Sequence, residues 1–545
     1  MKKWLVLSVV VLFIPLFSTP PPPSRAQARP QAVALCPALP LTGNVVHVST
    51  VAQLQSAVNG ASAGDTILIA DGTYNLDGVY LRVDTPHVTL RSASGDREAV
   101  RLDGNYLTTE IVQVVASDVT IADLTLREAY DHPIHVITDG DDTLNTLIYN
   151  VHIVDPGQQA IKINPGTSGG YPDGGTVACS HIELTGAGRP HIRDNCYTGG
   201  IDAHQARDWT VRDNTIDGFW CASGLSEHGI HFWRGCRDPV VERNVLRNNA
   251  RGIGFGLATS GDGRTYPDDP CPGASGYVDH FGGIVRNNIV FANDGGLFGS
   301  QYGFDCGICL WNACGPWVGH NTVASTQAPF SGIEWRFPNT DVDLVNNLLT
   351  HNLMDRDGLG TARLSNNRED QPLSLFVDGA GGDLHLVSTA AAAIDQGAAV
   401  GAWCSDDVDG QSRPAGPGFD IGADEYRAPV PETVFDLHIV SAITDTTTLT
   451  ATLAWTPPAD AITTSLRYAV SPIYDVPSWQ AATVLDDALP GHTSGYLAVV
   501  PFAADGTVYF ALITQNESGL SAVSGNNAFW PHWDLFLPLV SRRWP

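Results

Sequence analysis

Short segments with apolar second and fourth positions recur through the first two thirds of the chain. The segments PIHVI, AIKIN, GIDAH, GIHFW, GIGFG, GICLW and GIEWR begin at residues 133, 160, 200, 229, 252, 307 and 332. Their apolar pairs are Ile134/Val136, Ile161/Ile163, Ile201/Ala203, Ile230/Phe232, Ile253/Phe255, Ile308/Leu310 and Ile333/Trp335. Because side chains alternate across a strand, these pairs predict a buried face, and the third and fifth positions predict an outward face.

A second column, of asparagines, recurs at similar intervals. The aligned residues are Asn150, Asn214, Asn244, Asn288, Asn321 and Asn347, with His181 in the place between the first two. Intervals of about 26 to 44 residues with short apolar strands are typical of a solenoid of β-coils. Stacked asparagines can hydrogen-bond from coil to coil and hold the same bend in each coil.

The segment before the repeats predicts a helix. TVAQLQSAVNGA begins at Thr50 and has Gln53 three residues later, which is a capping box, and GDTILIADGTY follows as a strand. A helix at the open end of a coil stack would protect its edge strand from pairing with other chains.

Together these segments resemble the right-handed parallel β-helix proteins of the pectate-lyase type, over roughly residues 44 to 425. The GDTILIADGTY segment is similar to the start of the alginate lyase and chondroitinase B family. AIDQGAAVGAWCSDDVDGQSRPAGPGFDIGADEYR resembles the closing segment of secreted bacterial β-helix proteins with a choice-of-anchor tail. The resemblance implies an all-β fold, and we place the β-helix at residues 36–427.

The last quarter of the chain predicts a second, smaller domain. After the linker APVPE, residues 431–530 show short alternating strands similar to a fibronectin type III β-sandwich, with an expected role as a spacer. Residues 531–545 are a tail too short to span a bilayer.

The first residues of the chain indicate where the protein is located, and its net charge limits which partners it can bind. Two lysines, an apolar run and the small-x-small sequence Ala26-Gln27-Ala28 predict a signal peptide over residues 1–28, hence a secreted or cell-surface protein. The formal charge is −28, or −31 without the leader, which contains Lys2, Lys3, Arg25 and no acid. Such a charge argues against nucleic acid and anionic membranes as partners. No later segment is apolar enough to span a membrane, and we expect a monomer.

The ten cysteines predict up to five disulfides in an oxidising compartment. The pairing stays open, although Cys179 with Cys196 and Cys221 with Cys236 each bracket one short segment. The spacing of Cys306, Cys309 and Cys314 also allows a metal site, but a disulfide is favoured because no second cysteine pair or clustered histidines complete it.

The outward face gathers residues capable of acid–base chemistry. The third positions are His135, Lys162, Asp202, His231, Gly254, Cys309 and Glu334, and the fifth positions are Ile137, Asn164, His204, Trp233, Gly256, Trp311 and Arg336. Because neighbouring parallel strands lie about 4.8 Å apart, Lys162, Asp202 and His231 become direct neighbours. With His204 they would share a patch about 10 Å across.

Beside that patch, the glycine rung leaves a gap between two indoles. Trp233 and Trp311 would lie about 10 Å apart across Gly256, with room for a sugar ring to stack. Alternatively, the tryptophans pack under the inserted segment Leu257 to His280. Both alternatives stay open at this point.

These residue types suit a polymer of uronic acids. Removing the proton on carbon 5 builds negative charge on a carboxylate, so a catalyst needs a cation and a base. Lys162 and Arg336 are the candidate cations, and His204 and His231 the candidate bases. We predict Lys162, Asp202, His204 and His231 as catalytic residues. The predicted substrate-binding residues are Asn164, Trp233, Trp311, Glu334 and Arg336.

GGIDAHQARDWTVRDN followed by HGIHFWRG resembles the Asp-Pro-His segment and the following coil of the mannuronan carbon-5 epimerases. The resemblance implies catalytic roles for Asp202 and His204. This chain departs from the family in having Ala203 for the proline, and Gly199 for the tyrosine three residues before the aspartate, with only Tyr197 nearby.

A lyase shares the first step and then expels the carbon-4 substituent. The lyase resemblance implies a lysine base and an arginine acid one coil later; Lys162 fits the first role, but no arginine stands in that coil's outward positions. Hydrolysis is disfavoured because paired carboxylates lie about 5 to 9.5 Å apart, whereas Asp202 and Glu334 would be about 19 Å apart.

A non-catalytic reading also stays open: a cell-surface or matrix protein that binds carbohydrate or serves as a rigid rod. No cofactor is predicted, and no metal is assigned to the site. Calcium stays open, with Asp406, Asp407 and Asp409 as candidate ligands, but a polar loop is favoured because these residues lack the ligand spacing of a helix-loop-helix site. A specific ion also stays open at DHPIHVITDGDD, which begins at Asp131, although a solvated acidic turn is favoured there.

Overall fold

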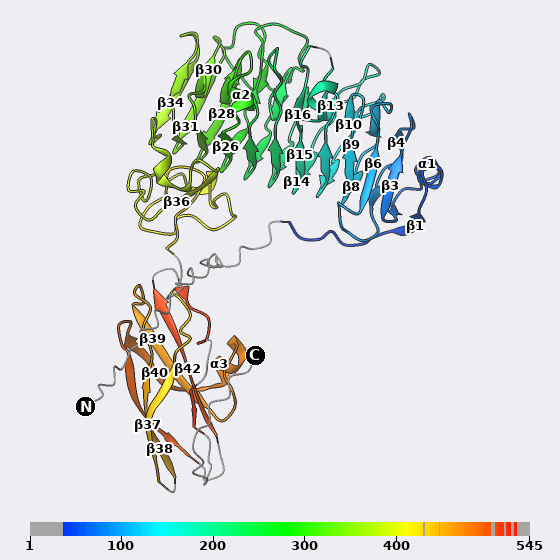
Figure 1. Cartoon of the computed structure of the whole chain (residues 1–545). Helices are drawn as coiled ribbons and strands as arrows, with labels where there is room; N and C mark the ends of the chain where they lie inside the picture. The colour runs from blue at the N-terminus through cyan, green and yellow to red at the C-terminus, as the bar shows by residue number, and fades with distance from the viewer. Residues whose placement is uncertain are drawn as a thin grey trace, which may run out of the picture. The chain divides into compact units, whose positions relative to one another are not determined.

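The structure, a computed structural model, describes residues 36–193, 195–428, 431–445, 447–502, 507–516, 519–524 and the backbone of 528–530 (Figure 1). The predicted signal peptide and the predicted tail, residues 1–28 and 531–545, lie outside the described residues. In the described part of the chain, no helix is both long and apolar enough to cross a membrane.

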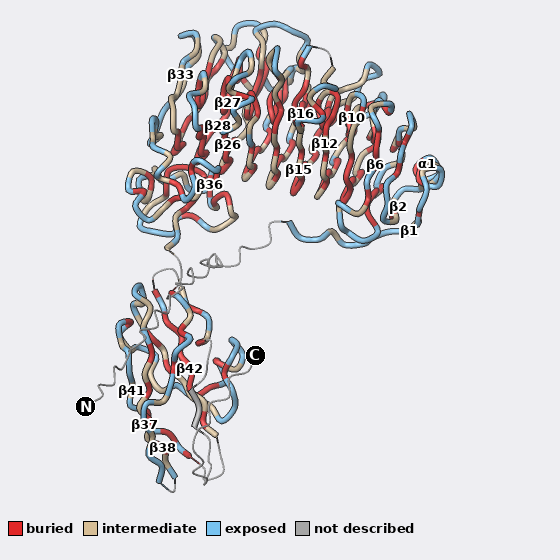
Figure 2. Tube along the Cα trace, in the orientation of Figure 1, coloured by how far each residue is buried: buried red, intermediate tan, exposed pale blue. Residues whose placement is uncertain are grey.

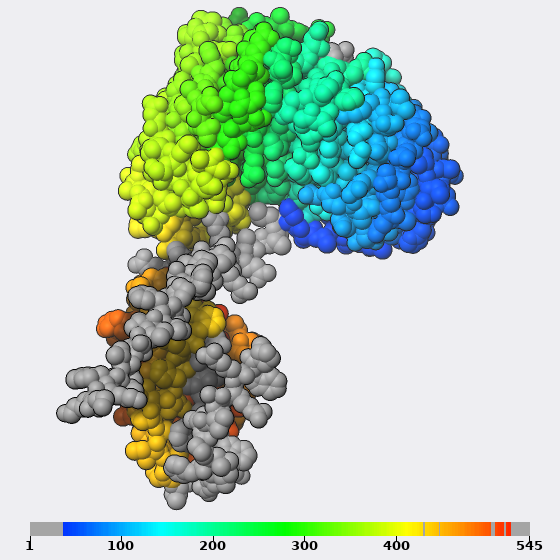
Figure 3. Space-filling model, viewed as in Figure 1, coloured from blue at the N-terminus to red at the C-terminus, as the bar shows by residue number. Residues whose placement is uncertain are grey.

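Residues 44–365 form a parallel β-helix, in which each coil contributes strands to three parallel sheets, here called A, B and C (Figure 1). Sheet A contains β1 (Asn44–Val48), β2 (Asp65–Ile69), β5 (Thr89–Ser92), β8 (Thr120–Ala122), β11 (Leu147–Tyr149), β14 (Thr176–Ala178), β17 (Thr210–Arg212), β20 (Cys236–Arg237), β21 (Val240–Glu242), β24 (His280–Phe281), β25 (Ile284–Arg286), β28 (Ala313–Gly319), β31 (Asp341–Val345) and β34 (Thr361–Ser365). Sheet B contains β3 (Gly72–Asn75), β6 (Val100–Asp103), β9 (Thr125–Arg127), β12 (His152–Val154), β15 (His181–Glu183), β18 (Thr215–Asp217), β22 (Val245–Arg247), β26 (Ile289–Ala292), β29 (Thr322–Ser325) and β32 (Leu348–Leu349). Sheet C contains β4 (Leu81–Val83), β7 (Glu110–Val114), β10 (His132–Ile137), β13 (Gln159–Asn164), β16 (Gly199–His204), β19 (Ile230–Trp233), β23 (Arg251–Phe255), β27 (Cys306–Trp311), β30 (Ser331–Arg336) and β33 (Leu353–Asp355). The coils follow one another in sequence order, from blue to yellow in Figure 3.

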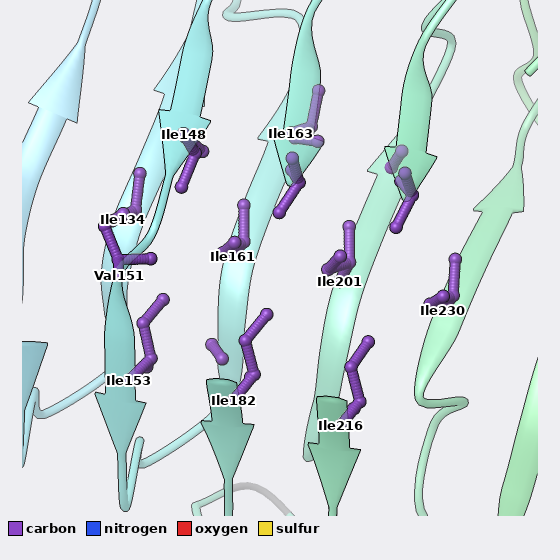
Figure 4. Packing of buried hydrophobic residues seen from close by; sticks show 14 of the residues in the cluster. Ile134, Ile148, Val151, Ile153, Ile161, Ile163, Ile182, Ile201, Ile216 and Ile230 are labelled. Carbon is purple, nitrogen blue, oxygen red and sulfur yellow. The ribbon is translucent and has the colours of Figure 1, made fainter. Parts of the chain in front are cut away.

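The interior of the β-helix confirms the predicted apolar columns. Every predicted pair is buried, and Ile161, Ile201 and Ile230 stack in register on neighbouring strands (Figures 2 and 4). They belong to one continuous hydrophobic cluster that runs from the first coil to the last. Burial of aliphatic side chains at about 1.5 to 3 kcal/mol each is what holds so long a stack of short strands together. The third and fifth positions of sheet C consequently point away from this core.

The asparagine ladder forms, with one correction. Each amide nitrogen donates to the next amide oxygen along Asn214, Asn244, Asn288, Asn321, Asn347 and Asn367, at 2.9 to 3.0 Å. Before Asn214 the ladder position is Ser180, whose backbone N–H donates to the Asn214 side chain. Asn150 and His181, predicted for this column, each lie one residue away from it. Asn150 occupies the bend position with φ +49°, a conformation that asparagine tolerates.

The predicted helix is α1 (Val51–Asn59). The Thr50 side chain accepts a hydrogen bond from the Gln53 N–H, and Leu54 and Val58 are buried against the first coil. The other helices are short: α2 (Gly295–Phe298), α3 (Val476–Ala481) and the 3₁₀ turns η1 (Arg189–His191), η2 (Leu373–Leu375) and η3 (Gly401–Trp403).

Four disulfides cross-link the described chain: Cys36–Cys179, Cys196–Cys221, Cys271–Cys314 and Cys306–Cys309. The pairing therefore differs from the two pairs that bracket short segments in the sequence. Cys236 and Cys404 are buried and carry no disulfide. Disulfides favour an oxidising, extracellular location.

The segment after the coils, which contains β35 (Phe376–Asp378) and β36 (Asp383–Leu386), packs on the outer side of sheet B. Of the candidate calcium ligands, Asp406 is bound to Arg243 at 2.6 Å. The Asp407 carboxylate is buried and accepts backbone hydrogen bonds from Asp409 and Gln411.

The C-terminal region forms two antiparallel sheets that share a core. One contains β37 (His438–Thr444), β38 (Thr448–Ala454) and β41 (Gly495–Pro501); the other contains β39 (Thr463–Ala469), β40 (Thr483–Pro490), β42 (Val508–Asn516), β43 (Gly519–Leu520) and β44 (Ala528–Trp530). The likeness to fibronectin type III and the domain boundaries stay predictions.

Candidate functional site

The candidate site lies on three neighbouring strands of sheet C, β13, β16 and β19. Each carries a polar residue at the third position of its repeated segment, which faces outward. Lys162 pairs in register with Asp202, and Asp202 pairs with His231. The structure therefore places the predicted neighbours side by side, although they are far apart in the sequence.

Lys162 and Asp202 form an ion pair that organises the residues around it. Lys162 Nζ contacts the Asp202 carboxylate, lies 3.0 Å from His204 Nε2 and donates to the Tyr197 hydroxyl at 3.2 Å. Asp202 Oδ2 lies 3.2 Å from the same His204 nitrogen. Asp202 Oδ1 accepts a hydrogen bond from Trp233 Nε1 at 2.7 Å. We call these five side chains the Lys162 cluster.

The outer members of the Lys162 cluster are the ones nearest to solvent. The Asp202 side chain is 1% exposed and the Lys162 side chain 9%, whereas the His204 side chain is 12% exposed and Tyr197 and Trp233 are half-buried. The Lys162–Asp202 ion pair thus lies at the buried base of the cluster. A molecule that approached sheet C here would meet His204 and Tyr197 first.

Burial and charge set the protonation states of the cluster. Burial lowers the pKa of Lys162, but the charge and hydrogen bond of Asp202 and the interaction with Tyr197 together outweigh it and hold that pKa above its ordinary value. Burial lowers the pKa of His204, and burial together with Asp202 raises the pKa of Tyr197. At neutral pH the amine is charged, the imidazole is neutral and the phenol keeps its proton. The cluster therefore offers a cation, a proton acceptor and a proton donor.

His231, predicted as a catalytic residue, lies behind the Lys162 cluster. Its side chain is fully buried, and its ring stacks on Trp233 with the centroids 5.2 Å apart. Its Nδ1 lies 3.6 Å from Asp202 Oδ1. Because it has no exposed surface, His231 lies beside Asp202 and away from solvent, and its predicted catalytic role stays a prediction.

Glu334, Trp311 and Arg336, predicted to bind substrate, form a second cluster further along sheet C. Glu334 is fully buried and accepts hydrogen bonds from Trp311 Nε1 at 2.6 Å, Ser331 Oγ at 2.7 Å and Arg356 at 2.8 Å. The Arg336 guanidinium lies 5.3 Å from the Trp311 ring centroid. Glu334 therefore has a packing role, and half-buried Arg336 is the predicted residue of this second cluster that reaches solvent.

The predicted gap between the two indoles is filled. A Cβ added at Gly254 would lie 2.5 Å from the His228 imidazole, so the glycine makes room for that ring. Trp311 is 2% exposed, and Leu257 of the inserted loop packs against it. The packing alternative is correct for Trp311, whereas Trp233 keeps a partly exposed ring.

Asn164, the remaining predicted substrate-binding residue, is half-buried at the end of β13. Its Oδ1 lies 2.9 Å from His135 Nε2, and its Nδ2 donates to the Pro165 carbonyl at 2.9 Å.

Tyr197 was not among the predicted site residues. It lies in the segment before β16, where the pattern of alternation gives no direction for a side chain, and it follows Cys196, which pairs with Cys221. The sequence signal that could have located it is its position five residues before Asp202, close to the tyrosine of the epimerase motif.

The strand pairing defines the class of protein: a parallel β-helix with a polar cluster on the outward face of one sheet. No protein-family model matches the chain, and no curated protein matches it. Among solved structures it is similar to an alginate lyase from Paenibacillus sp. (14% identity, 59% of this chain and 97% of the other, TM-score 0.32) and to a pectate lyase (14%, 68% and 90%, 0.42). It is also similar to the A-module of a mannuronan C-5 epimerase from Azotobacter vinelandii (15%, 58% and 90%, 0.38).

Proposed function

We propose that this protein acts on an extracellular polysaccharide containing uronic acids and removes the proton from carbon 5 of a sugar unit. The Lys162 cluster is the observation that carries the proposal, because one ammonium lies within hydrogen-bonding distance of a neutral imidazole and a protonated phenol.

The first step needs a positive charge beside the substrate carboxylate. Loss of the carbon-5 proton moves negative charge onto that carboxylate, and a fixed cation in a region of low dielectric stabilises the charge as it develops. Lys162 suits this role because Asp202 keeps it protonated. It is the only lysine beyond the predicted leader, so no other ammonium side chain can replace it.

The step also needs a base, and its completion needs an acid. His204 Nε2 lies 3.0 Å from the Lys162 ammonium and 3.2 Å from Asp202. The base role needs the tautomer in which Nε2 donates to Asp202 and does not accept from Lys162, because Nδ1 then keeps a lone pair that can accept the carbon-5 proton. The Tyr197 hydroxyl can then return a proton to carbon 5 from the other side, which inverts the centre, or protonate the oxygen on carbon 4 as it leaves. The first outcome is epimerisation and the second is β-elimination.

The test is to incubate the secreted protein with alginate, pectate and glycosaminoglycans in deuterated water. Elimination appears as ultraviolet absorbance of an unsaturated uronate. Epimerisation appears as loss of the H-5 signal from the proton NMR spectrum, because deuterium replaces the proton at carbon 5. We expect one of these signals on at least one polymer, reduced by about 10²- to 10⁴-fold in Tyr197→Phe.

His181→Gln, on the outward face of sheet B, is the matched control and should leave the rate unchanged. Binding of a uronate polymer with neither signal would favour the non-catalytic carbohydrate-binding alternative. Absence of both binding and turnover on all three polymers would refute the proposal.

A further inference from the structure

A group of buried polar atoms without hydrogen-bond partners lies behind the Lys162 cluster. Among the described residues, Glu227 Oε2, both ring nitrogens of His228 and His231 Nδ1 are buried and accept or donate no hydrogen bond. His228 and His231 have no exposed surface at all. Buried polar atoms are almost always paired, so four unpaired atoms in one place call for a missing partner.

Three of these atoms converge on a common point. His231 Nδ1 lies 3.1 Å and His228 Nδ1 lies 3.7 Å from Glu227 Oε2, yet neither contact is aligned as a hydrogen bond. One ligand atom from each of the three residues lies within 4.8 Å of the other two. In a tetrahedral site with bonds of about 2.0 to 2.2 Å, ligand atoms lie about 3.3 to 3.6 Å apart. The two separations from Glu227 Oε2, 3.1 and 3.7 Å, lie on either side of this range.

The hydrogen-bonding of His231 shows what kind of partner is missing. Its Nε2 lies 3.3 Å from the Gly256 carbonyl, which can only accept, so Nε2 is the donating nitrogen and Nδ1 is the nitrogen that can serve as a ligand atom. Nδ1 faces two carboxylates, Glu227 at 3.1 Å and Asp202 at 3.6 Å. A ligand nitrogen between two carboxylates favours a cation at this place.

The opposite side of His228 cannot supply this site. Its other ring nitrogen approaches the sulfurs of Cys306 and Cys309, but these are joined in a disulfide and carry no thiolate charge. The ligand atoms therefore lie on the side of Glu227 and His231.

We propose that Glu227, His228 and His231 bind one divalent transition-metal ion of the zinc class. Two imidazole nitrogens and one carboxylate oxygen are ligands typical of zinc, whereas calcium takes six to eight oxygen ligands. The Gly256 carbonyl holds the non-ligating nitrogen of His231 and so fixes the orientation of the ring, as outer groups do in zinc sites. The proposal does not depend on the proposed enzymatic activity.

The direct test is the metal content of the secreted protein, purified without an affinity tag, measured by mass spectrometry after dialysis against zinc. We expect about one equivalent of zinc, and a melting temperature that falls on stripping with a chelator and returns with zinc but not with calcium. Glu227→Gln, which keeps the shape of the side chain, should lose the bound zinc.

His181→Gln is the matched control, because it disrupts the partly exposed group His152, His181 and Glu183, which also has metal-ligand spacing. It should keep the full equivalent. Because Glu227→Gln could fail to fold, cobalt(II) loading of the unaltered protein provides a second readout, with the intense visible absorbance of a tetrahedral site expected. Zinc content near zero with no cobalt spectrum, loss of zinc in His181→Gln alone, or stabilisation by calcium alone would overturn the proposal.

Discussion

Two buried carboxylates on sheet C are held in nearly the same way. Asp202 accepts from the Trp233 indole at 2.7 Å and pairs with Lys162; Glu334 accepts from the Trp311 indole at 2.6 Å and pairs with Arg356. Each thus has one aromatic donor and one cation, on the outward face of the same solenoid.

The difference between them lies in what surrounds the ion pair. Next to Asp202 stand the neutral His204 imidazole, which can accept a proton, and the Tyr197 phenol, which can donate one, and both lie at the edge of solvent. Around Glu334 and Trp311 stand Ser331, Arg251 and Arg336, whose side chains do not accept or release protons near neutral pH. An ion pair on this face therefore stabilises the fold in both places. It is a candidate for catalysis only beside Asp202, where His204 and Tyr197 can accept and donate protons.

The strongest test of the difference between the two ion pairs is to remove the cation from each. Lys162→Met should lower turnover of a uronate polymer by about 10²- to 10⁴-fold, because the developing charge loses its counterion. Arg356→Met, the matched change in the second cluster, should leave the rate within about twofold while lowering the melting temperature. Rates are compared at a temperature where both variants are folded by circular dichroism. Equal losses of activity would show that the two clusters are equivalent.

The second carboxylate should matter for stability and not for binding. Glu334→Gln removes one of the two carboxylates that pair with Arg356, the other being Asp305 at 3.3 Å, and turns an amide toward Ser331. We therefore expect a loss of about 2 to 3 kcal/mol in the free energy of unfolding. Denaturant titration of the β-helix transition measures the loss. The Michaelis constant for polymer should not change; a large rise in it would return Glu334 to the substrate-binding residues.

A third comparison uses pH, because a region outside both clusters should control stability between pH 7 and 9. Burial lowers the pKa of His385, but the carboxylates Asp409, Asp424 and Asp383 outweigh it and raise that pKa to about 9. Burial raises the pKa of Asp407 and Asp420 to about 7. A raised pKa stabilises the fold below the ordinary pKa and ceases to do so as pH rises through the raised value.

The melting temperature should therefore fall from pH 7 to pH 9, corresponding to about 2 kcal/mol. Below pH 7 the buried histidines with lowered pKa, such as His132 and His280, gain stability as pH rises and oppose the loss from Asp407 and Asp420. His385→Gln should flatten the fall above pH 7, and Asp407→Asn should leave it in place. A melting temperature that rises over this interval would contradict the assignment. Neither Asp202 nor Lys162 contributes here, since the pKa of Asp202 is held well below its ordinary value and that of Lys162 above its own.

The sequence predicted those parts of the molecule that follow the repeat. Alternation fixed the direction of Ile201 and Ile230, and the stacking of the strands then placed Lys162, Asp202 and His231 together. The asparagine column was predicted from Asn214 onward. Asn150 was assigned to the ladder column wrongly, because asparagine is favoured both at the ladder position and at the left-handed bend position before it.

The parts that could not be predicted lie between the strands. Tyr197 and His228 belong to segments with no periodicity, so neither the phenol beside Lys162 nor the imidazole over Gly254 follows from the pattern. The exposure of an outward position also depends on such segments. His231 and Glu334 point outward from the core, as predicted, yet neighbouring side chains bury both.

The smallest expected effect comes from exchanging each indole for a ring without a donor. Trp233→Phe and Trp311→Phe each remove one hydrogen bond to a buried carboxylate, worth about 1.5 to 3 kcal/mol, so both should lower stability similarly. Only Trp233→Phe should also slow turnover, by about tenfold, because Asp202 then holds Lys162 and His204 less firmly. The loss of this donor raises the pKa of Asp202, so the acid limb of the pH–rate profile should move to higher pH in Trp233→Phe and stay in place in Trp311→Phe. Paired pH–rate profiles and melting curves measure both effects, and an equal shift in the two variants would mean that the indole at Asp202 has no role that the indole at Glu334 lacks.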